Sequence, residues 1–253
     1  IKINIKEIFS KDVDSLNNFF LIGKVEKGKF IKILAKSEFK DNNFLEISLK
    51  KIPNTKKKSL EIYSDSPKVL LKDFKFFKGV LGGKLLFTST FDEEQSISNL
   101  RIEKFKVSDA PAFAKLLTLA DLGGVSDLLS GDGISFSELE INLNKNNDTT
   151  NIEEIYAVGP SISVLMDGYV DNNSGLISLK GTMVPAKELN KLVAKIPIIG
   201  DILIGKEIGE GLFGVSFKMK GMPGKVKTIV NPIETLTPRF ITRALKKKKK
   251  KKK

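Results

Sequence analysis

The sequence predicts a mainly β fold with a few helices, built on an antiparallel sheet. Apolar and polar residues alternate along many short segments, such as Leu45–Lys50 and Leu85–Phe91, which is the pattern of a strand with one apolar face. Turn-forming residues such as Asp41–Asn43 and Gly82–Gly83 separate these segments. Because no long helical pattern lies between them, the segments favour an antiparallel meander.

Further strands are expected along the whole chain. The alternation resumes at Leu60–Ile62 and, in the second half, at Leu139–Leu143 and Ile162–Gly168. An earlier run changes its apolar parity after Ile102, which predicts a β-bulge near Glu103–Lys104. The remaining predicted strands are Ile177–Leu179, Val215–Met219 and Val226–Val230.

Two helical inserts and a short C-terminal helix are expected to interrupt the strands. Ser108–Pro111 supplies a helix cap with a proline in the first turn, and apolar residues at helical spacing follow over about Phe113–Leu122. The second insert spans about Pro185–Ile196 and ends at Pro197. Thr237–Pro238 begins the terminal helix.

The composition argues against an enzyme. The chain has no Cys and no His, which excludes Ser-His-Asp and Cys-His nucleophiles, disulfides and the usual zinc ligands. The adjacent carboxylates Glu93–Glu94 and Glu153–Glu154 lie in turn-like surroundings and indicate surface charge. Gly209–Gly214 matches a dinucleotide-binding motif but leads into a strand, so a glycine-rich turn is expected. We predict no cofactor and no metal site.

The net charge of +13 is concentrated at the C-terminus, where a lysine run occupies Lys246–Lys253. Lys56–Lys58 lies between two strands and is expected at a solvated hairpin tip, although phosphate contact is an alternative. The longest uncharged stretch, Ile155–Met166, is too short for a membrane-spanning helix. Since the chain starts at Ile1, we expect it to be the C-terminal piece of a longer protein.

The terminal helix and the lysine run together have the composition of an interfacial membrane contact. Lysines near an anionic surface each contribute about 1 kcal/mol, and the apolar face of a short helix adds to this. A capping helix with a solvated tail is the alternative. The candidate membrane-contacting residues are Phe240, Ile241, Leu245, Lys246, Lys247 and Lys248.

Several motifs of the C-terminal part follow one another in a family-like order. They are Gly181–Pro185, Leu189–Asn190, Ile196–Leu203, Val230–Pro232 and Leu236–Phe240. In order and spacing they resemble the C-terminal region of the AsmA-like family, and are closest to its YhdP-type, bridge-like lipid transfer members. The resemblance covers about the last 150 residues of the chain.

The resemblance implies an open, U-shaped, groove-like curved sheet in the bacterial periplasm. Such proteins are held in the inner membrane by an N-terminal segment, which would lie upstream of this chain. They are linked to phospholipid transport toward the outer membrane and to envelope integrity. On this basis residues 1–107 form a sheet portion of the groove, residues 108–245 form the AsmA-like region with its helical cap, and residues 246–253 form a polylysine tail.

An apolar strand face suits acyl chains, because each buried CH₂ contributes about 0.8 kcal/mol and no chemistry is required. The helices near Phe113–Leu122 and Leu189–Ile196 would close or gate the groove end. A closed core that packs the same faces is the competing reading. The candidate groove residues are Leu45, Ile47, Leu49, Leu60, Ile62, Leu85, Phe87, Ile141, Leu143, Ile162, Val164 and Met166.

The predicted partners are phospholipid acyl chains, an anionic membrane surface and possible envelope proteins. One alternative is an envelope assembly or scaffold module that binds proteins through sheet edges and carries no lipid. A second alternative, nucleic-acid binding through the lysines, would be steeply salt-dependent and would vanish without Lys246–Lys253. Nucleic acid is not among the partners we predict.

Overall fold

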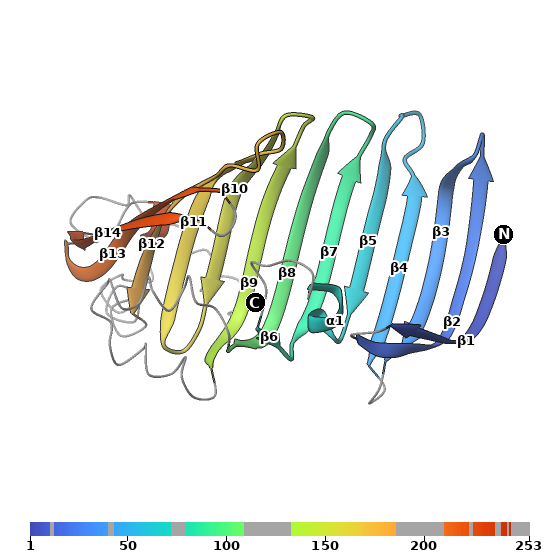
Figure 1. The fold of residues 1–253 in the computed structure, drawn as a ribbon, viewed down its shortest axis with the longest axis horizontal. Coiled ribbons are helices and arrows are strands. Elements are labelled where there is room, and N and C mark those ends of the chain that lie inside the picture. Colours follow the sequence, from blue (N-terminus) through green and yellow to red (C-terminus); the bar gives the residue numbers. More distant parts are fainter. Residues whose placement is uncertain are drawn as a thin grey trace, which may run out of the picture.

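The computed structural model describes residues 1–10, 13–39, 43–71, 79–108, 133–185, 210–222, 225–235, 239–241 and 243. Fourteen strands form one sheet, which curves along its length and stays open, with β1 and β14 at opposite ends (Figure 1). The mainly β fold and the open curved sheet are therefore confirmed.

The strands follow the chain from one end of the sheet to the other. They are β1 (Lys2–Ser10), β2 (Val13–Glu26), β3 (Lys29–Glu38), β4 (Phe44–Lys51), β5 (Lys58–Ser64), β6 (Val80–Leu81), β7 (Lys84–Phe91), β8 (Ser96–Val107), β9 (Ile134–Lys145), β10 (Thr149–Val158), β11 (Ile162–Asp171), β12 (Ile177–Pro185), β13 (Glu210–Gly221) and β14 (Lys227–Thr235).

Each strand pairs antiparallel with its neighbour in sequence, apart from the short β6, which pairs with β8 beside the main path. Short turns join most of these neighbours, whereas longer segments separate β5 from β7, β8 from β9 and β12 from β13. In Figure 1 the hairpins β4–β5, β7–β8 and β9–β10 lie along the upper edge of the sheet. The meander predicted from the alternating segments is confirmed.

The described helical residues are few. Helix α1 (Pro67–Leu71) starts with a proline, which suits a first helical turn, and it was not predicted from the sequence. Residues Arg239–Ile241 and Arg243 are helical, in agreement with the short C-terminal helix. The inserts expected over Phe113–Leu122 and Leu189–Ile196 lie outside the described residues.

The predicted β-bulge near Glu103–Lys104 is not present as an inserted residue. The pairing of β8 with β9 keeps one register on both sides of this point, from Glu103↔Glu138 to Phe105↔Phe136. Lys104 instead has a positive φ of 53°. This local twist lets both Ile102 and Phe105 be buried, although they are three residues apart.

A buried apolar cluster holds one part of the sheet together. It joins β6 to β13 and includes α1, whose Leu71 packs in the cluster and whose Leu70 packs against it. The cluster consists of Leu71, Val80, Leu85, Leu100, Ile102, Phe105, Ile134, Phe136, Leu139, Ile141, Ile155, Ala157, Ile162, Val164, Met183, Val215 and Phe217.

Candidate functional site

The most extensive chemical feature of the sheet is an apolar face that crosses almost every strand. Cross-strand partners share a face, so the pairing register shows which side chains line up. One row of partners follows the sheet from β1 to β14. It contains Ile3, Leu21, Ala35, Ile47, Ile62, Phe87, Leu100, Ile141, Ile155, Met166, Gly181, Phe217 and Val230.

The candidate groove residues all fall on this one face. Ile47, Ile62, Phe87, Ile141 and Met166 belong to the row above. The others lie on the same strands at positions an even number of residues away, which puts their side chains on the same side. The structure therefore brings together every residue that the alternating pattern assigned to the groove: Leu45, Leu49, Leu60, Leu85, Leu143, Ile162 and Val164 complete the set.

The apolar face is closed over the later strands. From β7 to β13 a neighbouring row is almost fully buried, with Ile102, Met183 and Val215 at 0% exposure. Leu85 and Val164 in the same row are nearly as inaccessible, at 2% and 3%. In this part of the molecule the face is a packed core.

The same face is partly open over the earlier strands. Ile47, Leu60 and Ile62 on β4 and β5 are only partly buried, as is Phe87 on β7. Their neighbours on β4, Leu45 and Leu49, are buried at 6% and 7% exposure, so only part of the face is accessible here. At the free edge, Ile3 and Ile5 of β1 are 36% and 40% exposed. Apolar side chains are thus accessible side by side across several strands, which is uncommon on a protein surface without a ligand or partner.

A glycine makes room for the Phe217 ring in the closed part. A Cβ atom on Gly181 would lie 2.5 Å from Phe217 Cζ and 2.8 Å from Met166 Cγ. Gly181 is the direct cross-strand neighbour of both residues. A larger residue here would have to displace the Phe217 ring, which is 2% exposed.

Hydroxyl groups interrupt the apolar face where its open and closed parts meet. Ser89 on β7 and Ser98 on β8 are cross-strand partners, and Ser98 Oγ donates to Ser89 Oγ over 2.9 Å. Both side chains are buried, so their mutual hydrogen bond compensates much of the cost of leaving water. Ser37 and Ser64, also buried, lie in the row next to Ala35 and Ile62.

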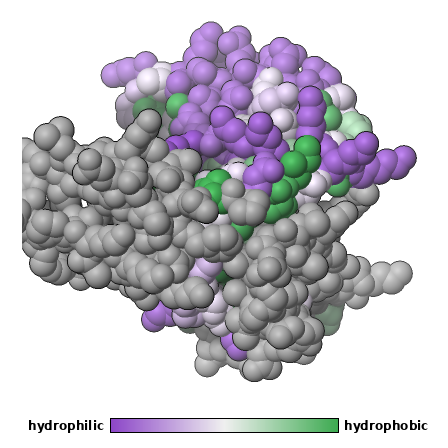
Figure 2. Space-filling view, turned by 90° about the vertical axis from the view of Figure 1, so that its left-hand side faces the viewer, coloured by the Kyte–Doolittle hydropathy of each residue, from purple (hydrophilic) through white to green (hydrophobic). Residues whose placement is uncertain are grey.

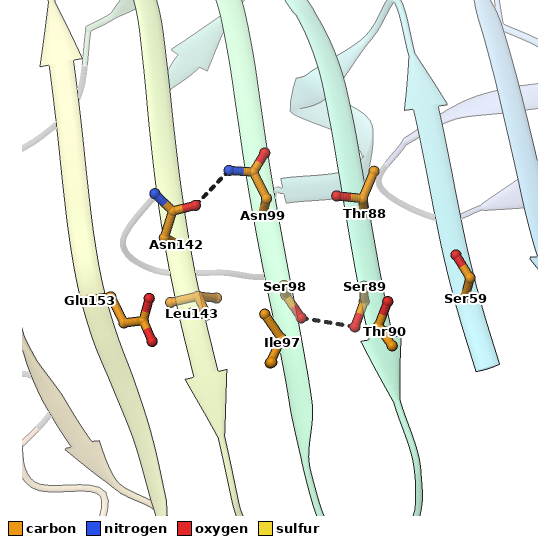
Figure 3. A pocket seen from close by; sticks show the side chains of 10 residues that line it. All are labelled: Ser59, Thr88, Ser89, Thr90, Ile97, Ser98, Asn99, Asn142, Leu143 and Glu153. Carbon is orange, nitrogen blue, oxygen red and sulfur yellow. Dashed lines mark hydrogen bonds between the residues drawn. The ribbon is translucent and has the colours of Figure 1, made fainter. Parts of the chain in front are cut away.

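The opposite face is polar and carries a shallow depression of about 250 Å³. Figure 3 shows Asn99 and Asn142 on adjacent strands, joined by a hydrogen bond of 2.7 Å. Ser59, Thr88, Thr90, Ile97, Asn99, Asn142 and Glu153 line it, together with Ser89, Ser98 and Leu143 from strand positions of the apolar face. Since Glu153 is the one carboxylate among them, the depression has no pair of acids for general acid–base catalysis.

The centre of the polar face is acidic and binds the C-terminal helix. Arg239 Nη1 lies 2.6 Å from Asp167 Oδ1. Arg243 Nη2 lies 2.5 Å from Glu140 Oε2, and its Nε lies 2.7 Å from Glu154 Oε1. The guanidinium of Arg243 also stands 4.7 Å from the centroid of the Tyr156 ring.

These contacts shift the ionisation of the groups beneath the helix. Burial opposes ionisation of Glu140, but the hydrogen bond and charge of Arg243 outweigh it and hold the pKa of Glu140 below its usual value. Burial raises the pKa of Tyr156 to about 12. Both groups therefore keep their neutral-pH charge states across the physiological range.

Phe240 and Ile241, two of the residues expected at a membrane contact, are buried in this structure. Their side chains are 0% and 1% exposed, and the Phe240 ring meets the Tyr156 ring edge to face at 6.4 Å. The apolar side of the helix is thus directed at the sheet. The other candidates for membrane contact, Leu245 and Lys246–Lys248, lie outside the described residues.

The remaining sequence motifs lie in strands and turns. The glycine-rich turn expected at Gly209–Gly214 is wrong, because the residues from Glu210 onward belong to strand β13. No helix opens there to receive a phosphate. Lys56 lies in the β4–β5 turn, as expected of a hairpin tip. The described residues contain no cluster of three or more potential metal ligands and no helix long and apolar enough to cross a membrane.

Two features of the site were not predicted from the sequence. The apolar face begins at β1–β3, where the alternation at Ile1, Ile3 and Ile5 was available as a signal. The ion pairs of the C-terminal helix join residues far apart in sequence, such as Arg243 and Glu140. The four-residue spacing of Arg239 and Arg243 indicates one helix face but not its acidic partners.

Figure 2 views the molecule from the β13–β14 end, where polar residues crowd the upper part and a smaller apolar patch lies below them.

Comparison with known proteins identifies no relative: no family model, no curated protein and no solved structure matches this chain.

Proposed function

We propose that this chain is a lipid-binding segment that holds acyl chains on the apolar face of its curved sheet and is not an enzyme. The observation that carries the proposal is the set of partly exposed apolar side chains on this face over β2–β7, such as Ile47, Ile62 and Phe87, continuous with the buried cluster that extends to β13. A surface of this kind holds hydrocarbon without directional contacts, at about 25 cal/mol for each Å² removed from water. Lipid can therefore slide along it.

The biological setting of the proposal comes from the resemblance to AsmA-like proteins. On this basis the chain would lie in the bacterial periplasm as the C-terminal part of a bridge for phospholipid between inner and outer membrane, supporting envelope integrity. An inner-membrane anchor would precede Ile1, and the polylysine tail would meet an anionic membrane surface. The open sheet is compatible with this role.

Two adjacent residues on β7 provide a matched test. Phe87 lies on the apolar face, whereas Thr88 lies on the polar face, and both are partly buried. We would purify the protein and each variant from bacterial membranes in mild detergent and examine them by native mass spectrometry. Wild type and Thr88→Asp are expected to retain phospholipid, and Phe87→Asp is expected to lose it.

Lipid retained by a folded Phe87→Asp variant would contradict the assignment of the apolar face. Lipid-free wild type would contradict lipid binding altogether. Circular dichroism of both variants separates a local effect on binding from unfolding.

A second candidate function is a scaffold that binds an envelope protein by strand addition. It is favoured by β1, which pairs on one side only within the described sheet and carries Ile1 at 62% exposure beside Ile3 and Ile5. Such an edge accepts a partner strand through its free backbone groups. Proline substitution of Asn4, whose N–H points away from β2, would weaken a protein complex of this kind but leave lipid retention unchanged.

A further inference from the structure

A pair of lysines lies at the border of the open part of the apolar face, next to the turn between β4 and β5. Lys51 and Lys58 are direct cross-strand partners at the ends of β4 and β5. Both follow the parity of Leu49 and Leu60, the next pair inward, so all four side chains belong to the apolar face. The face therefore changes from hydrocarbon to two positive charges within one step along the strands.

The two charges are not neutralised by neighbours. Lys58 has Phe91 as its partner on β7, and Phe91 is paired in turn with Ser96. Among the ion pairs of the described residues, none involves Lys51 or Lys58. Like charges directly opposite each other destabilise a sheet, and an anion between them would remove that cost.

The nearby acids are engaged elsewhere. Asp92 accepts hydrogen bonds from the backbone N–H groups of Glu94 and Gln95, which hold its pKa below the usual value. Glu93 is paired with Lys29. Asp92 and Glu93 of the adjacent β7–β8 hairpin thus have partners other than the lysine pair.

A second cross-strand lysine pair differs from Lys51 and Lys58 in the face on which it lies and in its exposure. Lys32 and Lys50 are also cross-strand partners, and they lie on the polar face of the same strand β4. Both are exposed, whereas Lys58 is partly buried beside the Phe91 ring. Of these two pairs, the one at Lys51 and Lys58 adjoins apolar side chains, of which Leu60 is partly accessible and Leu49 is buried.

The depth of that surface fits the hydrocarbon part of a lipid. From Leu49 to Leu45 the strand advances by four residues, or about 14 Å at about 3.4 Å per residue. One leaflet of a bilayer has a hydrocarbon layer of about 15 Å. An acyl chain lying along β4 and β5 would reach from the lysine pair to the far side of the face.

We propose that Lys51 and Lys58 bind the anionic head of an amphiphile whose acyl chain lies on the partly accessible side chains of Leu60, Ile62 and Ile47. The ligand class is a phosphate or carboxylate joined to a long hydrocarbon chain, as in a phospholipid or a fatty acid. This inference rests on the proposed function, since it needs the apolar face to hold the chain. It adds a defined position and orientation for the head group.

The test compares two probes that differ only in head-group charge. cis-Parinaric acid is an anionic fluorescent fatty acid, and its methyl ester has the same chain without the charge. Fluorescence titration of the full chain is expected to give an affinity for the acid about three- to tenfold higher than for the ester. In Lys51→Gln/Lys58→Gln the acid and the ester should bind equally, whereas Lys32→Gln/Lys50→Gln should keep the preference for the acid.

Each failure has a distinct meaning. Equal affinity of wild type for acid and ester, or a preference that survives in Lys51→Gln/Lys58→Gln, overturns the lysine assignment alone. Absence of binding for both probes contradicts the proposed function itself. Inorganic phosphate is the third probe: if it displaces cis-parinaric acid at equal concentration, the pair binds a free anion and the assignment to an amphiphile is overturned.

Discussion

The two parts of the sheet share one apolar face but use it differently. Over β8–β13 the row at Ile102, Met183 and Val215 is fully buried. Over β4 and β5 the corresponding face leaves Ile47, Leu60 and Ile62 partly accessible. In the closed part the apolar side chains are buried and stabilise the fold. In the open part some of them are accessible, and we propose that a ligand contacts them.

The polar faces of the two parts differ in the solvent exposure of their ion pairs, which is lower in the closed part. Behind the closed part, Arg243 makes two ion pairs with limited solvent access, its side chain being 16% exposed. In the open part, the ion pair of Lys36 with Glu46 has side chains 56% and 50% exposed. One antiparallel sheet can therefore carry poorly exposed ion pairs at one end and well exposed ion pairs at the other, with the same strand topology throughout.

The largest predicted effect separates the two parts by stability. Ile102→Ala in the closed part should lower the free energy of unfolding by about 2–5 kcal/mol, because it leaves a cavity in a fully packed region. Ile62→Ala in the open part should cost less than half as much, since its side chain is already partly solvated. Urea denaturation of both variants measures the difference, and equal losses would remove the distinction.

The next effect concerns the two kinds of ion pair. Arg243→Ala is expected to cost about 1–3 kcal/mol, because it leaves Glu140 and Glu154 with unpaired charge beneath the C-terminal helix. Lys36→Ala should change the unfolding free energy by about 0–1 kcal/mol. If the two variants were equally stable, the C-terminal helix would contribute nothing to the closed part.

A smaller effect is expected where the two parts meet. Ser98→Ala removes the donor to Ser89 and leaves one buried hydroxyl without its partner, at a cost of about 1 kcal/mol. Ser89→Ala/Ser98→Ala should recover part of this loss, because both hydroxyls are then absent. A double-mutant cycle in urea measures the coupling, and additive losses would show that the hydrogen bond has no influence on stability.

Acidification gives the smallest predicted change. The pKa of Glu140 is lowered in the folded protein, so its contribution is complete above the ordinary glutamate pKa and is lost as the pH falls through the folded value. The stability of wild type should therefore decline below about pH 4.3 more steeply than that of Glu140→Gln. Parallel pH profiles of the two proteins would contradict the role given to this ion pair.

The sequence was sufficient for the strands and for the side each residue faces. Alternation at Leu45–Leu49 placed these side chains correctly because the strand period is strict and the turns are short. Alternation could not tell Ile62 from Ile102, since exposure depends on what packs over a face rather than on the strand itself.

The C-terminal helix shows a second limit of sequence reasoning. Its apolar residues Phe240 and Ile241 fitted both a membrane contact and a capping helix. The capping arrangement is observed, because Arg239 and Arg243 on the same helix meet acids contributed by β9, β10 and β11. Those acids are about 70 to 100 residues away in the chain and are brought together only by the sheet.

The measurement that tests the central claim most directly is the position of an acyl chain on the open part of the sheet. The chain contains no cysteine, so single labels can be placed at Ile62→Cys on the apolar face and Glu61→Cys on the polar face. A nitroxide-bearing stearic acid is expected to quench a fluorophore at position 62 and not at position 61. Equal quenching at both positions, or none at either, would contradict acyl-chain binding by the apolar face.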